Sequence, residues 1–539
     1  SYFQDKKSFV YKYIFPEQEF KLKKGRSVII ANNTDPNRAD YAGKIQELDH
    51  INKSLLLRKG ISKDQNKLPR ILSISEKVME HARFENLNRN IYLFCENVLN
   101  KKDGFEAIKS FLNRDIPSIK GKKAGEKIIE TENFTDEIPK VINNLNNSYL
   151  YLQGPPGSGK TYQAANAILE LIKRNKKIAI TANSHKVIHN LLERIEGLAK
   201  NKKHTFKGLK MGNVENDDTF FDGKFVKTEK NEKHFINQLK DDKTLLYAGT
   251  KYHLSQKYYQ NKLDYLFVDE ASQISVADLV ALGGIAKNII LVGDNAQLSQ
   301  PVKGNHPGES GKSVLDYLLQ GKDTILDSHG VFLKKTYRLH PNLNDFISEN
   351  FYENRLLINE KNINRKIDYK KSSIIQSEGI HTILMKHEDR SQTSLEELEI
   401  VKKLMDQLIG SKFRDFDNSE RKISVNDILI VSPFNAQVNF LKSRLHKDAK
   451  IGTIDKFQGM EAPITIISMT SSSVEDLPRN KKFFFNRNRL NVAISRAQCS
   501  SIILMNPKLL ETPPSDYDEF KLLNYFQKLM KFEKKIAIN

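Results

Sequence analysis

The feature that most constrains this chain is a glycine-rich loop between a predicted strand and a predicted helix. Residues 154–161 read Gly-Pro-Pro-Gly-Ser-Gly-Lys-Thr, which fits the pattern G-x-x-x-x-G-K-[ST]. Alternating apolar residues at 149–153 predict a short buried strand before the loop, and the spacing of apolar residues at 164–174 predicts a helix after it. This arrangement binds phosphates, because glycines let backbone N–H groups approach the oxygens and the helix N-terminus adds partial positive charge.

The loop therefore predicts a site for ATP and Mg²⁺. The ammonium group of Lys160 would reach the β- and γ-phosphates, and the hydroxyl of Thr161 would be a magnesium ligand. The remaining loop residues expected around the phosphates are Gly154, Pro155, Pro156, Gly157, Ser158 and Gly159. A glycine-rich turn with a chance lysine would not explain the flanking strand and helix.

Acidic residues follow two further predicted strands. The apolar run 263–268 ends at Asp269 and Glu270, and the run 288–292 is followed by Asp294 and Gln297. Downstream of a phosphate loop, such a pair predicts that Asp269 holds magnesium and that Glu270 takes the proton of the attacking water. Strands and helices also alternate in the second half of the chain, without a second glycine loop. We expect an α/β fold with two doubly wound parallel sheets.

The N-terminal part has a different pattern. Short apolar segments punctuated by glycine and asparagine at residues 8–57 predict a small β-barrel, and its alternating aromatics are expected in the core rather than stacked on bases. Residues 73–112 have helical spacing. Residues 201–243 are polar and charged with little periodicity, which predicts an insertion or a solvated subdomain.

Composition limits the function classes. The chain has 86 Lys plus Arg against 66 Asp plus Glu, a formal charge of +20, which suits a polyanionic partner, although a general lysine bias would give the same excess.

Two cysteines exclude a disulfide scaffold or a cysteine-rich metal centre within this chain and favour a reducing, cytoplasmic compartment. No apolar run is long enough to span a membrane and no signal peptide is recognisable, so no membrane partner is expected. The first residue is Ser rather than Met, which indicates a processed product or part of something longer.

Two histidines four residues apart, His185 and His189, have the spacing of metal ligands on one helix face. No third ligand is recognisable nearby, so a zinc site is not predicted.

The order of the motifs resembles superfamily 1B helicases, the group containing the nonsense-mediated-decay RNA helicase and senataxin, and looks most like bacterial members. Some of those are joined to a RecB-like nuclease, so a nuclease domain or subunit is an expected partner. The stretches that carry the resemblance are 154–161, 269–273 (Asp-Glu-Ala-Ser-Gln), 293–298 (Gly-Asp-Asn-Ala-Gln-Leu), 336–341 (Thr-Tyr-Arg-Leu-His-Pro), 432–437, 452–461 and 489–496.

The resemblance implies two RecA-like domains that face each other across a nucleotide cleft. Arg338 and Arg496 would reach the γ-phosphate from the second domain, Gln297 would sense that phosphate, Tyr337 would stack on the base and Glu461 would contact the ribose side. The residues implied along the path of a nucleic-acid strand are Ser184, His185, Thr250, Pro433 and Thr453.

The resemblance also implies a division of the chain. The expected parts are a β-barrel at 1–70, a helical stalk and linker at 71–135, a first RecA-like domain at 136–200 and 244–325, an insertion at 201–243 and a second RecA-like domain at 326–539. The expected activity is ATP-driven translocation on single-stranded DNA or RNA, with duplex unwinding from 5′ to 3′.

Several questions stay open at this level. No glutamine motif is found upstream of Tyr149, since Gln153 adjoins the loop, so base specificity is undecided. His185 stands where many relatives have Asn, and the run after Gly293 is one residue longer than the commonest form. DNA and RNA are not distinguished, because both are held through phosphates and base stacking. A nucleotide-gated clamp or remodeller that does not unwind processively would carry the same motifs. A metabolic kinase would leave Arg496 and the net charge unexplained.

Overall fold

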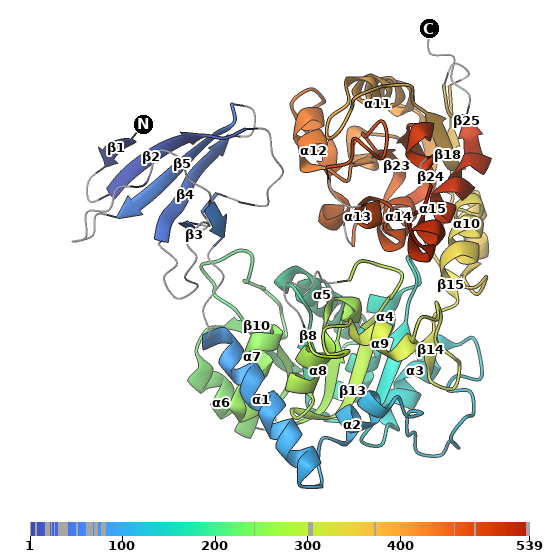
Figure 1. Ribbon diagram of the computed structural model, residues 1–539. Helices are drawn as coiled ribbons and strands as arrows, with labels where there is room; N and C mark the ends of the chain where they lie inside the picture. Colours follow the sequence, from blue (N-terminus) through green and yellow to red (C-terminus); the bar gives the residue numbers. More distant parts are fainter. Residues whose placement is uncertain are drawn as a thin grey trace.

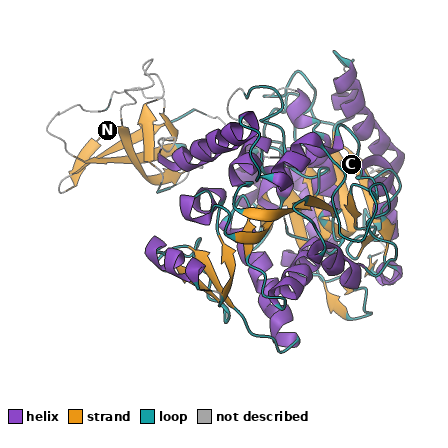
Figure 2. Cartoon of the chain, turned by 90° about the horizontal axis from the view of Figure 1, so that it is seen from below, coloured by secondary structure: helices purple, strands orange, loops and turns teal. Residues whose placement is uncertain are grey.

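The computed structural model describes residues 2–5, 8–16, 22, 24–25, 27–30, 41–49, 52–60, 68, 74–76, 82–241, 243–299, 306–370, 373–457, 459–478, 481–511 and 513–534. They form three parts, an N-terminal antiparallel sheet and two domains each built on a parallel sheet (Figure 1). The antiparallel sheet stands apart from the two domains in both views (Figures 1 and 2).

The first domain has an eight-stranded sheet in the order β10-β9-β11-β8-β12-β13-β7-β14, with every neighbouring pair parallel. Its strands are β7 (Tyr149–Gln153), β8 (Ile178–Thr181), β9 (Lys207–Met211), β10 (Val226–Glu229), β11 (Thr244–Ala248), β12 (Leu263–Val268), β13 (Ala286–Gly293) and β14 (Gly330–Phe332). All parallel strands end at one edge of a sheet, so the segments that follow β7, β8, β11, β12 and β13 lie along the same edge.

Helices cover both faces of this sheet, which is why its central strands are apolar at consecutive positions. Leu150 and Leu152 pack with α3 (Phe134–Asn143), α4 (Lys160–Ile172) and α5 (His185–Asn201). Tyr149 and Tyr151 lie in the core on the other face. The helices on that face are α1 (Ala82–Leu99), α2 (Glu106–Asn113), α6 (Glu232–Lys240), α7 (Lys251–Leu254), α8 (Val276–Leu282) and α9 (Val314–Leu319).

The second domain has a six-stranded parallel sheet in the order β22-β21-β23-β24-β18-β25. Its strands are β18 (Gly379–Leu384), β21 (Ile428–Val431), β22 (Lys450–Gly452), β23 (Ala462–Ser468), β24 (Ala497–Met505) and β25 (Glu533–Lys534). Helices α11 (Leu395–Leu408) and α12 (Asn435–Lys442) cover one face, and α10 (Pro341–Phe351), α13 (Lys481–Phe484), α14 (Arg487–Ser495) and α15 (Tyr517–Leu529) cover the other. The predicted α/β fold with two RecA-like parallel sheets is confirmed.

Two small sheets connect and flank the domains. Strand β15 (Lys335–Thr336) pairs with β16 (Leu357–Ile358), and β17 (Lys366–Asp368), β19 (Lys412–Arg414) and β20 (Glu420–Lys422) form an antiparallel sheet. The chain crosses from the first to the second domain through β14, β15 and α10, on the right of Figure 1.

The N-terminal sheet has the order β1-β2-β5-β4-β3-β6 and is antiparallel throughout. Its strands are β1 (Tyr2–Asp5), β2 (Ser8–Ile14), β3 (Ser27–Ile30), β4 (Tyr41–Asp49), β5 (Ser54–Gly60) and β6 (Ile74–Glu76). Among the described residues β1 and β6 are the edge strands of this sheet, and the small β-barrel expected from the sequence stays a prediction. Tyr11 lies in its core with Val28 and Leu57, as expected for an aromatic strand that packs inward. The asparagine-rich stretch 32–37 lies outside the described residues.

Two parts of the first domain differ from the sequence-based division. Residues 201–243, expected to be an insertion of little periodicity, contribute β9 and β10 to the edge of the main sheet. Strand β14 pairs with β7, so the first domain continues to Phe332 rather than ending at 325. No helix in the described part of the chain is long and apolar enough to cross a membrane.

Candidate active site

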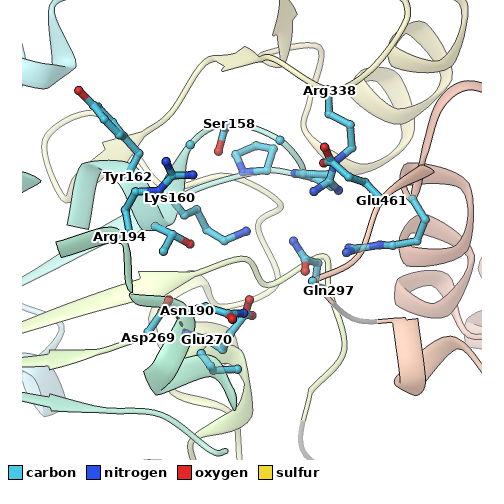
Figure 3. A pocket seen from close by; sticks show the side chains of 18 of the residues that line it. Ser158, Lys160, Tyr162, Asn190, Arg194, Asp269, Glu270, Gln297, Arg338 and Glu461 are labelled. Atoms are coloured by element: carbon cyan, nitrogen blue, oxygen red, sulfur yellow. Dashed lines mark hydrogen bonds and ion pairs between the residues drawn. The ribbon is translucent and has the colours of Figure 1, made fainter. Parts of the chain in front are cut away.

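A pocket of about 320 Å³ lies between the two domains, at the edge where β7, β12 and β13 end (Figure 3). It is lined by Pro155, Pro156, Gly157, Ser158, Gly159, Lys160, Thr161, Tyr162, Lys186, Val187, Asn190, Arg194, Asp269, Glu270, Gln297, Arg338, Gly459, Glu461 and Arg496. The first domain contributes the glycine loop and the acidic pair, and the second contributes two arginines and Glu461.

The glycine loop needs glycine for space as well as for conformation. Gly157 has a φ of 71°, and a Cβ there would lie 2.4 Å from the Cβ of Arg338. A Cβ on Gly154 would lie 1.9 Å from Cγ of Lys160. The side chain of Lys160 can therefore fold back along the loop only if residue 154 is glycine. In the same way, Arg338 can approach the loop this closely only if residue 157 is glycine.

The acidic pair is largely enclosed. Asp269 is 4% exposed, and burial together with the charge of Glu270 raises its pKa to about 7, while Lys160 lowers it. Glu270 has a φ of 49°, which is strained for a residue with a side chain, and its Oε2 is buried without a hydrogen-bond partner among the described residues. An unpartnered buried acceptor fits a bound water, and the oxygens of Thr161 and Asp269 are of the kind that Mg²⁺ prefers.

Gln297 is held by a buried network that spans the domains. Its Nε2 donates to Oδ2 of Asp294 at 2.8 Å, and the same carboxylate oxygen accepts from the hydroxyl of Tyr352 at 2.7 Å. Asp294 is fully buried, and burial raises its pKa while its hydrogen bonds and Lys160 lower it, with a net upward shift. Asn491 of α14 donates to the carbonyl of Ala296 at 2.8 Å and to Tyr352 at 3.1 Å.

The two arginines face the pocket from the second domain. Arg338 forms an ion pair with Glu461 (2.5 Å) and donates to the carbonyl of Ser495 at 3.1 Å. Arg496 is 2% exposed and donates to the carbonyls of Val492 and Met460, each at 3.2 Å. Burial and the neighbouring charge of Arg338 lower the pKa of Arg496 to about 9, while Glu270 and Glu461 act in the opposite direction. Two close cations, of which Arg338 alone forms an ion pair among the described residues, suit an additional anionic ligand.

Glu461 is the carboxylate of the ion pair with Arg338. Burial raises its pKa, and the charge and hydrogen bond of Arg338 and the hydrogen bond of Gln498 lower it, so that the net shift is downward.

The structure brings most of the predicted nucleotide residues into this pocket and leaves two outside its lining. Gly154 lies behind the loop, where its N–H donates to the carbonyl of Gly293 at 2.9 Å. Tyr337 is 55% exposed beside the loop, with its N–H donating to the carbonyl of Gly157 at 2.9 Å.

The sequence did not lead us to expect that residues of α5 line one side of the pocket. Lys186, Asn190 and Arg194 are spaced by four residues and therefore lie on one helix face, which lines the pocket. That periodicity was visible in the sequence, but only the fold shows that this face turns toward the acidic pair (Figure 3). Tyr162, Val187 and Gly459 were missed as well.

The predicted strand-path residues all follow parallel strands. Ser184 caps α5 after β8, accepting from the N–H of Val187 at 3.3 Å, and Thr250 precedes α7 after β11. Thr453 follows β22 and is half-buried, whereas Pro433, which follows β21, is buried. The place of Pro433 on the strand path stays a prediction. His185 is half-buried, with Nδ1 unpartnered among the described residues.

The rings of His185 and His189 are 6.3 Å apart. Within the described ranges, no three His, Cys, Asp or Glu side chains are grouped as metal ligands would be.

Comparison with known proteins agrees with this division into two domains. Two family models, both described as AAA domain, match residues 139–302 and 311–508. They cover most of the two parallel-sheet domains and both sides of the pocket, and the second of them also includes α9 and β14 of the first domain.

Three relatives illustrate the similarity. The DNA replication ATP-dependent helicase/nuclease dna2 of Schizosaccharomyces pombe is 25% identical over 66% of this chain and 26% of its own length. The DNA polymerase alpha-associated DNA helicase A of Saccharomyces cerevisiae is 25% identical over 77% of this chain and 68% of its own length. The regulator of nonsense transcripts 1 homolog of Arabidopsis thaliana is 24% identical over 71% of this chain and 34% of its own length. The chain thus spans about a quarter of the first relative, two thirds of the second and a third of the last.

Proposed function

The chain belongs to the superfamily 1 helicases of the group that includes the nonsense-mediated-decay helicase, and we propose that it is an ATP-driven, magnesium-dependent translocase on single-stranded nucleic acid. The observation that supports this most strongly is the composition of the pocket. Arg338 and Arg496 come from the domain without a glycine loop and line the same cavity as Lys160 and Glu270. Such a site is complete only when the two domains meet, which is how hydrolysis can drive movement between them.

The residues of the first domain bind ATP and activate water. The loop N–H groups and Lys160 hold the β- and γ-phosphates, and Thr161 and Asp269 hold Mg²⁺, which when bound neutralises charge on the phosphate oxygens. Glu270 accepts the proton of the attacking water through its unpartnered Oε2. Gln297 contacts the γ-phosphate and the water from the opposite side.

The residues of the second domain stabilise the charge that develops on the transferred phosphoryl group. Arg338 exchanges Glu461 for phosphate oxygens, and Arg496, which donates to carbonyls and forms no ion pair among the described residues, gains an anionic partner. Tyr337 stacks on the base at the exposed side of the loop, and Glu461, once released, is available to the ribose hydroxyls.

The strand runs along the carboxyl edges of the two sheets, past Ser184, His185, Thr250 and Thr453, with Pro433 reached only after a local change. A +20 chain favours such a polyanion. Single-stranded DNA and RNA both fit, since one relative is named a DNA helicase and another a regulator of nonsense transcripts. Movement in the 5′-to-3′ direction, an N-terminal barrel on a helical stalk, a nuclease domain or subunit as partner, and a cytoplasmic location are parts of the same proposal.

A nucleotide-gated clamp or remodeller is the second candidate. The contacts between Gln297, Asp294 and Tyr352 favour coupling of nucleotide state to domain position, which a clamp also needs.

Hydrolysis measured with and without single-stranded DNA or RNA tests the proposal, beside strand displacement on partial duplexes with a 5′ or a 3′ overhang. Stimulated hydrolysis with displacement from the 5′ overhang is expected. Stimulation without displacement would favour the clamp, and equal rates with and without strands would contradict both.

A further inference from the structure

The loop that carries Arg338, residues 336–339, is hydrogen-bonded by a side chain that lies outside every predicted motif. Arg365 lies at the end of a short 3₁₀ segment (Glu360–Asn364) and is 3% exposed. Its Nη1 donates to the carbonyls of Tyr337, at 2.9 Å, and of Arg338. We propose that Arg365 is a positioning residue for hydrolysis, which fixes the backbone from which Arg338 reaches the phosphates. This inference rests on the proposed function.

A second side chain completes the support. Nδ2 of Asn362 donates to the carbonyls of Thr336 and Leu339, each at 3.0 Å. All four carbonyls from Thr336 to Leu339 therefore accept a hydrogen bond from Asn362 or Arg365. This stretch runs from the end of β15 to the start of α10, outside both elements, and the carbonyl of Thr336 also accepts from the N–H of Asn359 at 2.9 Å.

The same loop touches the glycine loop directly. Oγ1 of Thr336 donates to the carbonyl of Pro156 at 2.8 Å, and the N–H of Tyr337 donates to the carbonyl of Gly157 at 2.9 Å. The loop is thus held between the phosphate-binding backbone on one side and Arg365 on the other. A displacement of about 1 Å in such a place is enough to lower a rate ~10²-fold.

The surroundings of Arg365 suit a guanidinium group and no other cation. Nε donates to Oδ1 of Asp415 at 2.8 Å, and the guanidinium carbon lies 5.1 Å from the ring centre of Phe416. One planar group therefore meets a carboxylate, an aromatic ring and two carbonyls, each in a fixed direction. Lysine would keep the charge but lose the fork geometry.

The variants Arg365→Gln, Arg365→Lys and Asn362→Ala test this role, with Arg421→Gln as the matched control. Arg421 belongs to β20 of the small sheet whose middle strand, β19, directly precedes Asp415, but it pairs with Asp427 at 2.7 Å and is exposed. Turnover, the KM for ATP, the Kd of a fluorescent ATP analogue and the thermal midpoint are measured for each.

Arg365→Gln should lower kcat ~10²-fold while the nucleotide Kd stays within about threefold, because the glycine loop is untouched. Arg365→Lys should be about as slow as Arg365→Gln, and Arg421→Gln should behave as the parent. Restoration by lysine would show that charge rather than geometry matters and would overturn the proposal. Parallel loss of kcat, nucleotide affinity and thermal midpoint would assign Arg365 a merely structural role.

The double variant gives the sharpest readout. If Arg365 acts through Arg338, Arg338→Ala combined with Arg365→Gln should be no slower than Arg338→Ala alone. Multiplied losses would refute the inference. Where Arg365→Gln fails to fold, Asn362→Ala alone and with Arg338→Ala decides by the same comparison.

Failure of this inference and failure of the proposed function are distinguishable. A parent protein that does not hydrolyse ATP, or an Arg338→Ala variant with parental turnover, would contradict the proposed site. Low turnover of Arg338→Ala together with parental turnover of Arg365→Gln would contradict only the role of Arg365.

Discussion

Lys160 and Glu270 line the same pocket with opposite charges, and the proposed function gives them separate tasks. Lys160→Ala should abolish hydrolysis and weaken ATP binding, because it removes the charge that holds the β- and γ-phosphates. Glu270→Gln should keep ATP binding and lower turnover ~10²-fold or more, because shape survives while the proton acceptor is lost. Nucleotide titration beside steady-state turnover separates the two effects. Glu388→Gln, an exposed carboxylate paired with Lys508, is the control. A Glu270→Gln variant with parental turnover would show that the base is misassigned.

Arg338 and Arg496 are predicted to act on hydrolysis even when no strand is present. Replacing either arginine with Gln should lower basal turnover by ~10³ while much of the ATP affinity remains, because such arginines act mainly in the transition state. If these residues instead bound strand phosphates, the variants would lose strand affinity and keep the parental basal rate. Measuring hydrolysis without nucleic acid therefore decides between the two roles.

At the scale of elements, the loop after β13 and the segment after α9 are both hydrogen-bonded to α14. Asn488 donates to the carbonyls of Asn295 and Gln297 at 2.9 and 2.8 Å, and Arg487 forms two hydrogen bonds with Asp323 at 2.6 and 2.7 Å. The segment that positions Gln297 is thus bonded along its length to the helix that ends at Arg496. We infer that these two elements move as a pair.

Tyr352→Phe tests the buried centre of that contact. The variant loses the hydroxyl that donates to Asp294, and ~1–3 kcal/mol of stability is expected to go with it. Because the folded pKa of Asp294 is raised, the fold loses stability as pH rises from the unfolded pKa of this carboxyl to its folded pKa. The loss should therefore be largest above the folded pKa and smaller at acid pH, where both proteins hold Asp294 protonated and the hydrogen bond from Asn491 is still lost. Denaturant unfolding at several pH values measures it, with Tyr517→Phe, an exposed tyrosine of α15, as control. A difference independent of pH would contradict the role of Asp294.

The central elements were predictable because their patterns are local. The strands at 149–153, 263–268 and 288–293 are apolar runs closed by glycine or acid. Strands that are apolar at consecutive positions predict helices on both faces of the sheet. Strands β9 and β10 were missed because an edge strand such as Val-Lys-Thr-Glu at 226–229 buries one residue, exposes one and leaves two half-buried. Its pairing depends on a neighbour, which periodicity does not report.

The candidate site divides in the same way. Lys160, Asp269 and Glu270 could be predicted because each lies in a short motif whose residues are adjacent along the chain. Arg194 and Arg365 could not, since the first reaches the pocket through the packing of α5 beside α4 and the second through contacts with carbonyls of a distant loop. A carbonyl has no side-chain signature in the sequence.

At the scale of the whole molecule, the proposed strand path crosses both domains along their carboxyl edges, so its affinity should depend steeply on salt. The slope of log affinity against log salt is expected to be about −0.7 for each phosphate contacted on a single strand. Titration of labelled DNA and RNA strands by anisotropy over a tenfold range of potassium chloride measures it. A flat response would show that the +20 charge is not used on nucleic acid.

The hydroxyl residues on that path should respond differently from the charges. Thr250→Ala and Thr453→Ala remove neutral donors, so each should weaken binding by ~1 kcal/mol, about fivefold, at every salt concentration and leave the slope unchanged. Ser443→Ala is the matched control, because Ser443 ends α12 at the amino edge of the second sheet and its hydroxyl bonds only the carbonyl of Phe440 and Arg444 among the described residues. If Thr250→Ala and Thr453→Ala bind as tightly as Ser443→Ala, the strand does not follow the carboxyl edges. If only one of them weakens binding, the strand contacts a single domain, and a translocase that advances by alternating its grip between two domains would be ruled out.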